Sequence, residues 1–331
     1  MNVKINKRHT YVNRCVLIDG MYRQAKSLHA PVMCSFNDCE MWETLVAVDT
    51  YPALSYLKLV SNEVASAMIE REIDMRSYYK LIGRQVNFRK NDTSGIYRFR
   101  NPNLYIDRAN SVVEYEALND LISEKTKNCF VYVTHDVMTN PGVFFEAVPN
   151  ASIIWSRRHP VHVAHSWLLK NWGDRHGKDP VSLGLSFTVD GQNAVPWHAV
   201  EWANEWHSIN STERIIKSYQ YLMKLEKINY LKYKDNYSIT PLFFESAIID
   251  QERYLEKLEI ISQKKPSSDT LNICKRERVP RKIHKNEYKD KLENLRSKMS
   301  DKYIKLLDNL IEEYEQDFFE NEGFKFSEVY K

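Results

Sequence analysis

A polar segment near the N-terminus has the composition of a phosphate-binding loop. Residues 15–19 form a short apolar run typical of a buried strand, and Gly20-Met-Tyr-Arg-Gln-Ala-Lys-Ser27 follows directly. A glycine permits a tight turn, and the unpaired N–H groups at the start of a following helix attract anions together with the helix dipole. We therefore expect an anion to be held here by Gly20, Arg23, Gln24, Ala25, Lys26 and Ser27.

A second polar group follows another apolar run. Residues 152–156 lead into Arg157-Arg158-His159-Pro160, and Ser166 lies six positions beyond the proline. Proline suits the first position of a helix. The sequence therefore predicts Arg158 at the end of a strand and Ser166 inside the next helix.

This spacing resembles that of the sulfotransferases that use 3′-phosphoadenosine 5′-phosphosulfate (PAPS). In that family an Arg-x-Pro segment follows a strand, a serine lies eight positions beyond the arginine, and both residues bind the 3′-phosphate of the donor. Arg158 and Ser166 match this spacing. The resemblance implies that the chain binds PAPS and releases adenosine 3′,5′-bisphosphate (PAP).

The loop at Gly20 is similar to the family's 5′-phosphosulfate loop, G-x-P-R-S-G-T-T. Gly20 and Arg23 match it, Ser27 keeps a hydroxyl group, and the residues between Arg23 and Ser27 depart from it. Ala25 fits beside a phosphate if its dihedrals stay in the ordinary helical region. Lys26 adds a cation that the family loop lacks, and we expect it, with Arg23, to stabilise the charge that develops on the transferred group and the leaving phosphate.

Two residues are candidates for the base that deprotonates the acceptor. Cytosolic sulfotransferases have a Lys-Thr-His whose histidine takes this proton, and Val133-Thr134-His135 resembles it 23 residues before Arg158. A neutral imidazole can accept a proton from an attacking alcohol. Glycan- and tyrosine-modifying members use a glutamate shortly after the loop, where Glu40 lies, and burial beside Trp42 would raise the pKa of Glu40 towards neutrality.

Later segments resemble the family less specifically. Trp197, Trp202 and Trp206 fall where the family has an aromatic helical region, and we expect them to be core residues. Residues 230–235 resemble its late strand. The family's late Arg-Lys-Gly contact to phosphate has no clear counterpart, although Arg281 and Lys282 lie in the corresponding region.

The resemblance implies in-line transfer of a sulfuryl group to a hydroxyl or amine of a small molecule or glycan. The scheme requires no metal. His159, His162 and His165 are spaced by three, but a zinc site usually has a further protein ligand that the sequence does not indicate.

Two other functions stay open. The loop differs from the ATP-binding P-loop G-x-x-x-x-G-K-[ST] only at Ala25, so an ATP-dependent kinase acting on a small molecule or glycan is one alternative. Asp19 or Asp136 would then ligate magnesium together with Ser27. An inactive relative that only binds nucleotide is the other alternative.

The elements that must position these residues indicate an α/β fold. The apolar runs at residues 15–19, 130–134 and 152–156 alternate with helix-like segments, a pattern that predicts a three-layer α/β/α domain of P-loop NTPase type around a parallel sheet. Ligands bind such sheets beyond the carboxyl ends of the strands. We expect one domain over residues 1–331, with a helix over 61–90 and an amphipathic helical extension over 285–321 packed on the body.

The bulk composition excludes several classes of protein. The 331 residues carry a net charge of only +3, which argues against a nucleic-acid partner. No stretch approaches the roughly 18 apolar residues that cross a bilayer, and the N-terminus lacks a signal peptide's apolar core, so a cytoplasmic location is expected. The five cysteines are scattered without a CxxC pair, which indicates free buried thiols. The sequence leaves open whether the chain forms a homo-oligomer.

Overall fold

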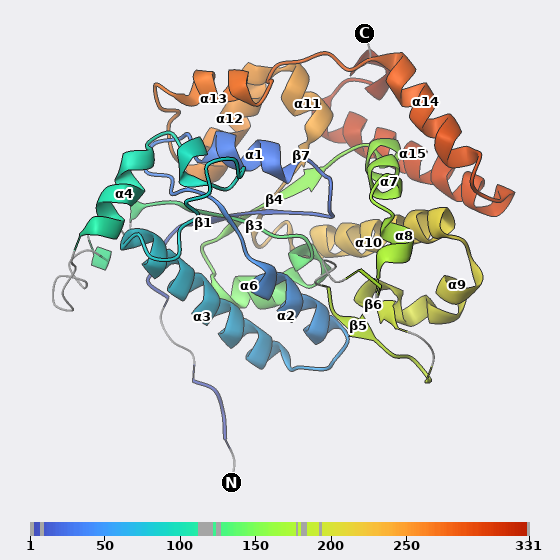
Figure 1. The fold of residues 1–331 in the computed structure, drawn as a ribbon, viewed down its shortest axis with the longest axis horizontal. Coiled ribbons are helices and arrows are strands. Elements are labelled where there is room, and N and C mark those ends of the chain that lie inside the picture. Colours follow the sequence, from blue (N-terminus) through green and yellow to red (C-terminus); the bar gives the residue numbers. More distant parts are fainter. Residues whose placement is uncertain are drawn as a thin grey trace.

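A parallel sheet of five strands lies at the centre of the molecule, with helices on both faces (Figure 1). The computed structural model describes residues 3–6, 10–111, 122–123, 127–176, 178–179, 184–191 and 194–329. The strand order is β2-β3-β1-β4-β7, and every pairing is parallel. The strands are β1 (Cys15–Asp19), β2 (Glu43–Thr44), β3 (Phe130–Val133), β4 (Ser152–Arg157) and β7 (Ser238–Phe243). The predicted three-layer α/β/α class is confirmed.

The three central strands consist mostly of apolar residues, which point to both faces of the sheet. Val16 of β1 is paired with Val131 of β3 on one side and with Ser152 of β4 on the other. All residues of β1, β3 and β4 are buried, as expected for strands covered by helices on both faces of a parallel sheet. The three predicted strands are confirmed.

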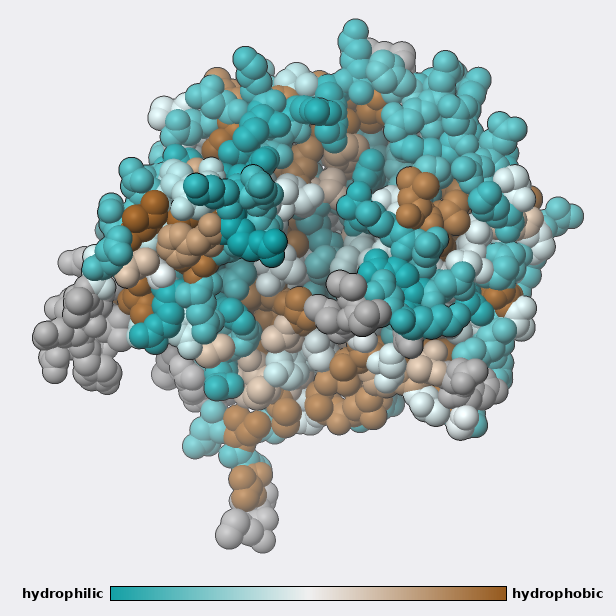
Figure 2. Space-filling model, viewed as in Figure 1, coloured by the Kyte–Doolittle hydropathy of each residue, from teal (hydrophilic) through white to brown (hydrophobic). Residues whose placement is uncertain are grey.

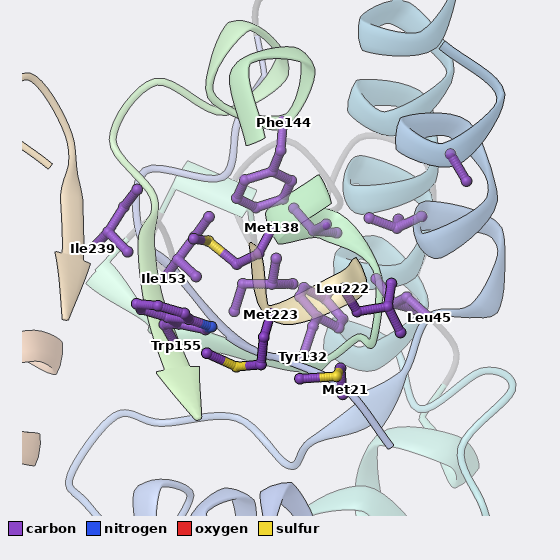
Figure 3. Close-up of a cluster of buried hydrophobic side chains, with 14 of the residues drawn as sticks. Met21, Leu45, Tyr132, Met138, Phe144, Ile153, Trp155, Leu222, Met223 and Ile239 are labelled. Carbon is purple, nitrogen blue, oxygen red and sulfur yellow. The ribbon is translucent and has the colours of Figure 1, made fainter. Parts of the chain in front are cut away.

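Alternate residues of each strand enter two different hydrophobic clusters. Leu17, Tyr132 and Trp155 belong to one cluster, and Val16 and Ile154 belong to the other, because successive side chains of a strand point to opposite faces. In Figure 3, Tyr132, Ile153 and Trp155 of the sheet lie together with Met138, Phe144 and Met223 from the covering segments. Replacing a buried aromatic residue such as Trp155 with alanine is expected to cost about 3–5 kcal/mol.

The helices divide between the two faces (Figure 1). The first cluster is covered by α2 (Val46–Tyr56), α3 (Asn62–Leu81), α6 (Pro141–Ala147) and α10 (Ser211–Tyr233). The second is covered by α1 (Lys26–Met33), α4 (Pro102–Asn110), α11 (Phe244–Ile249), α12 (Gln251–Ser262) and α13 (Thr270–Arg276). The shorter elements are η1 (Ile96–Arg98), η3 (Val137–Thr139), α7 (Pro160–Leu168), α8 (Trp172–Arg175), β5 (Ser186–Phe187), β6 (Val195–Pro196), η4 (Trp197–Trp202), α9 (Ala203–Ser208) and η5 (Phe326–Val329).

The C-terminal extension is two helices, α14 (Lys285–Arg296) and α15 (Asp301–Glu322), which pack on α7 and α10. Between them, Ser300 directly precedes α15, and its N–H donates to the Glu213 carboxylate at 2.9 Å.

The prediction of a late strand at residues 230–235 is wrong. This segment forms the C-terminal end of α10 and the turn after it, and the strand β7 begins only at Ser238. A capping box between Asn210 and Glu213 starts α10, and no glycine or proline interrupts the helix before residue 234.

Three further observations concern the described part of the chain. All five cysteines are buried and free, as expected. No helix among the described residues is both long enough and apolar enough to cross a bilayer. The face seen in Figure 2 is mostly hydrophilic, and it is hollowed near the centre, where Figure 1 shows the carboxyl ends of β1 and β4.

The strand order defines where a ligand site can lie. The chain passes from β1 to one side of the sheet, through β2 and β3, and then crosses to β4 on the other side of β1. This reversal beside β1 is a topological switch point, and ligands of open α/β sheets bind there beyond the strand ends. The loop after β1 and the residues that follow β3 and β4 therefore meet at one place.

Candidate active site

The loop after β1 has the backbone geometry of an anion-binding concavity. Gly20, Arg23 and Ala25 have φ values of +126°, +72° and +66°, whereas Gln24 has a negative φ. This alternation turns successive N–H groups towards one side, as in the nests that bind phosphate. Within the described ranges, the N–H groups of residues 23–27 donate to no other residue.

Ala25 departs from the expected ordinary helical dihedrals. It caps α1 in the left-handed region, which the second glycine of a P-loop would adopt without strain. Its methyl group packs against the hydrophobic cluster on that face of the sheet, and this contact offsets part of the cost. The substitution thus keeps the backbone form that a glycine permits.

Lys26 lies beneath the loop. Its ammonium group donates to the carbonyl oxygens of Gly20 and Met21, the latter at 2.8 Å, and only 5% of the residue is exposed. Burial lowers the pKa of Lys26 to about 8, although the nearby carboxylates, Asp19 foremost, oppose this shift. Lys26 therefore holds the loop in shape, and Ser27 next to it is exposed.

Gln24 contributes no side chain to the loop surface. The side chain is completely buried, and neither of its polar atoms has a hydrogen-bond partner. The backbone carbonyl of Gln24 accepts a hydrogen bond from the hydroxyl of Ser156 in β4. That bond ties the loop to the neighbouring strand.

The second predicted anion group lies against the first. Nη1 of Arg158 donates to the carbonyl of Arg23 at 3.3 Å, and Nε of Arg23 donates to the hydroxyl of Ser166 at 2.7 Å. Proline at the start of α7 places Ser166 inside that helix, as predicted. The structure therefore brings Arg23, Arg158 and Ser166 together.

Arg281 joins this cluster of cations. The guanidinium carbons of Arg158 and Arg281 lie 4.6 and 4.9 Å from the ring centroid of Phe244. Burial lowers the pKa of Arg158, and the like charges of Arg281 and Arg23 lower it further, against the opposing charge of Glu245. Nε of Arg158 is buried without a partner. An anion with several negative charges would relieve this repulsion.

His135 lies directly beside the loop. Its ring stacks on Tyr22 with centroids 3.8 Å apart, and Asp49 of α2 lies 3.0 Å from its Nδ1. Asp49 also accepts the backbone N–H groups of His135 and Asp136, at 2.5 and 3.2 Å. The carboxylate therefore fixes both the imidazole ring and the backbone that carries it.

Burial shifts the acidity of this pair in opposite directions. It lowers the pKa of His135 well below the ordinary value, and the nearby charge of Lys26 lowers it further. It raises the pKa of Asp49 to about 8, helped by the charge of Asp19 and opposed by the two backbone N–H donors. His135 is therefore a neutral imidazole at physiological pH, the form that a general base requires.

A cavity of about 370 Å³ opens beside His135. It is large enough for a small organic ligand, and apolar side chains form most of its wall. The polar groups of the cavity include His135, Asp49 and Asp136. Its aromatic lining consists of Tyr22, Trp167, Trp172, Phe187, Trp197 and Trp206. Trp197 and Trp206, expected only in the core, thus also face this space.

Glu40, the other candidate base, does not line this cavity. The residue is 2% exposed, its two oxygens bind Nη1 and Nη2 of Arg108 at 2.8 and 2.9 Å, and Tyr105 and Asn128 donate to it as well. Burial alone would raise the pKa of Glu40, but the Arg108 guanidinium and the other donors hold it below the ordinary value. The prediction that burial raises the pKa of Glu40 is wrong, because the buried carboxylate has a cationic partner.

The three regularly spaced histidines do not converge. His159 is completely buried and stacks on Phe326 at 4.5 Å, and its ring centroid lies 6.0 Å from that of His162. Among the described residues, no group of three or more histidine, cysteine, aspartate or glutamate side chains could hold a metal.

Sequence reasoning missed Asp49 and Tyr22. Asp49 was detectable as a single acid within the apolar helical segment Leu45-Val-Ala-Val-Asp-Thr-Tyr, where a charge needs a partner. Its pairing with His135 joins residues 86 positions apart, and no local pattern specifies such a contact.

Comparison with known proteins found similarity to solved structures but not to known sequences. No protein-family model matches this sequence, and no curated protein matches it. Among the solved structures, one that is similar is the crystal structure of sulfotransferase STF9 from Mycobacterium avium, with 11% identity, a TM-score of 0.43, and coverage of 92% of this chain and 76% of that one. At this identity and TM-score, the likeness says nothing of activity, acceptor or mechanism.

Proposed function

We propose that this chain is a sulfotransferase that moves a sulfuryl group from PAPS to an acceptor held in the cavity beside His135. One observation carries the proposal. The loop of unpaired N–H groups after β1 and the Arg158–Ser166 pair after β4 lie in direct contact, through the 3.3 Å bond from Arg158 to the Arg23 carbonyl. Two adjoining anion sites suit a ligand with phosphate groups at two positions.

The residues divide between the two ends of such a donor. The N–H groups of residues 23–27 and the Arg23 guanidinium would hold the 5′-phosphosulfate, and Lys26 keeps the loop in shape from below. Arg158 and Ser166 would hold the 3′-phosphate, together with Arg281 across Phe244. The donor supplies an activated sulfuryl group.

His135 is the proposed base. It lines the cavity, touches the loop through Tyr22, and has its Nδ1 beside the Asp49 carboxylate. With the ring proton on Nδ1, donated to ionised Asp49, Nε2 is free to take the proton of the acceptor hydroxyl or amine. Glu40 is less suited to this role, because both its oxygens bind Arg108.

Isothermal titration with PAP in EDTA tests the proposal. We expect metal-independent binding of PAP and weak binding of ATP with magnesium. The opposite order of affinities would favour the kinase. A kinase also needs an acid at the metal, and the oxygens of Asp19 already accept Thr134 Oγ1 and the N–H groups of Val137 and Met138. PAP binding without turnover of PAPS over a broad acceptor panel would indicate the inactive relative.

A further inference from the structure

The cavity contains two carboxylates whose surroundings differ. Asp49 is fully engaged, because it accepts two backbone N–H groups and lies beside His135 Nδ1. The Asp136 carboxylate accepts a hydrogen bond from Nε1 of Trp197, which lies 3.2 Å from its Oδ2. Within the part of the chain that the structure describes, no lysine, arginine or histidine forms an ion pair with Asp136.

Lys26 and Arg175, two cations near the cavity, already have hydrogen-bond or ion-pair partners. Lys26 donates to two loop carbonyls, and Arg175 at the cavity wall pairs with Asp179 at 2.6 Å. His198 in the wall is neutral, because burial lowers its pKa to about 3, and its Nε2 lies 3.1 Å from the Ser218 hydroxyl. His176, also in the wall, has its pKa lowered by burial, so among the described residues Asp136 has no paired cation.

The pKa of Asp136 reflects the lack of a paired cation among the described residues. Burial raises the pKa of this carboxyl well above the ordinary value, and the charges of Asp49 and Asp19 add to the rise, while the Trp197 hydrogen bond opposes it. A half-buried carboxylate without a paired cation is costly to ionise. A positive group in the cavity would remove this cost.

The wall around Asp136 suits a cation as well. Trp197 donates to the carboxylate, and Trp167 and Trp172 stack at 5.7 Å on the same cavity, with Tyr22 4.5 Å from Trp172. Aromatic faces attract ammonium groups, and they also provide the apolar surface against which an aromatic ligand packs.

We propose that the acceptor is a small aromatic amine that also carries the hydroxyl to be sulfated, with its ammonium group paired to Asp136 among the cavity tryptophans. This inference rests on the proposed function. A volume of about 370 Å³ holds a single aromatic ring with a short side chain. The hydroxyl proton goes to Nε2 of His135, the new O–S bond replaces the bond from sulfur to the donor phosphate, and PAP leaves.

Calorimetry with matched ligands tests the proposal. Tyramine and tyrosol are both para-substituted phenols, but one ends in an ammonium group and the other in a neutral hydroxyl. Each is titrated into wild-type protein and into Asp136→Asn, with PAP present at saturation. We expect the wild type to bind tyramine at least about 10-fold more tightly than tyrosol, and Asp136→Asn to lose this preference.

Two controls separate the possible failures. PAP binding is measured first for both proteins, so that failure of the donor proposal, or misfolding of the variant, is recognised independently of the amine. If the variant does not bind PAP, the wild type still decides, because its preference for tyramine over tyrosol is measured without the variant.

Three results would overturn the inference. They are equal binding of tyramine and tyrosol by the wild type, a tyramine preference that persists in Asp136→Asn, and no binding of tyramine by protein that binds PAP normally.

Discussion

The Asp49 carboxylate lies 3.0 Å from Nδ1 of His135 and also accepts the backbone N–H of that histidine. Buried Asp49 in α2 thus meets half-buried His135 after β3, and Tyr22 stacks on the imidazole. Because the two groups share a hydrogen bond in a desolvated place, they titrate as a unit. The protonation of Asp49 therefore decides which ring nitrogen of His135 is free.

Activity is expected to depend on this titration. The pKa of Asp49 is raised to about 8, so at neutral pH its proton is donated to Nδ1 and the ring hydrogen occupies Nε2. Loss of the Asp49 proton moves the ring hydrogen to Nδ1 and frees Nε2 as base. We predict that kcat/KM rises with pH through about 8, as measured with saturating PAPS.

Asp49→Asn should abolish the alkaline rise and lower kcat by about 100-fold or more, because an amide holds the wrong tautomer of the imidazole. PAP affinity should stay within about 3-fold, since the variant lies outside the donor site. Asp107→Asn on the exposed side of α4 is the matched control. An unchanged pH profile in Asp49→Asn would show that Asp49 plays no part in positioning His135.

The stability of the protein should depend on the same carboxyl. The folded pKa of Asp49, about 8, lies above that of an unfolded aspartate, so the folded state binds the proton more tightly. Its contribution is complete below the unfolded pKa and is lost as pH rises towards 8, by at most about 1.4 kcal/mol per pH unit. Urea unfolding from pH 5 to 8 should therefore show Asp49→Asn gaining stability relative to wild type. A parallel pH dependence of the two proteins would contradict the prediction.

The sequence predicted the layout of the site because that layout follows from local patterns. Apolar runs marked β1, β3 and β4, and parallel strands bring their carboxyl ends to one edge, so residues after each run had to meet. In the structure, Arg158 donates to the carbonyl of Arg23, and Tyr22 of the same loop stacks on His135.

Pairings between distant segments were not predictable in this way. Arg108 neutralises Glu40 across 68 positions, and without that contact the burial of Glu40 beside Trp42 pointed to the wrong direction of its pKa shift. Residues 230–235 resemble the family's late strand, whereas the helix that begins after Asn210 continues to Tyr233.

Donor affinity should depend on Arg158. Charge-assisted hydrogen bonds to a phosphate contribute about 1.5–3 kcal/mol each, so Arg158→Ala is expected to weaken PAP binding by about 10- to 100-fold. Arg158→Lys should retain part of the affinity, because an ammonium keeps the charge without the forked geometry. Arg296→Ala, which removes a surface ion pair with Asp308, is the control. Unchanged affinity by calorimetry would remove Arg158 from the donor site.

Glu40 and Arg108 should matter for stability. Removing one partner of a buried ion pair costs about 3–5 kcal/mol, so Glu40→Gln is expected to lower the free energy of unfolding by a similar amount. Asp308→Asn breaks an exposed pair with Arg296 and should cost about 1 kcal/mol or less. The kcat of folded Glu40→Gln should stay within about 3-fold of wild type, since Glu40 does not line the cavity. Near-normal stability with a 100-fold loss of kcat would instead identify Glu40 as the base.

The left-handed conformation of Ala25 gives a test of the loop itself. Alanine at a φ of +66° carries a cost of about 1–2 kcal/mol that glycine avoids, and glycine loses about 0.4–1 kcal/mol through the greater entropy of its unfolded chain. Ala25→Gly should therefore leave the free energy of unfolding unchanged or raise it by up to about 1 kcal/mol, and PAP affinity should be kept.

Ala25→Val should lower the free energy of unfolding by about 1–3 kcal/mol, because a β-branched residue is poorly tolerated at positive φ. Ala65→Gly, inside α3, is the control and should cost about 1 kcal/mol or more, since helical dihedrals suit alanine there. If urea unfolding finds Ala25→Gly as destabilising as Ala65→Gly, the loop does not hold the left-handed backbone that turns its N–H groups towards an anion. The donor site would then have to be sought among the side chains of Arg23, Arg158 and Arg281 alone.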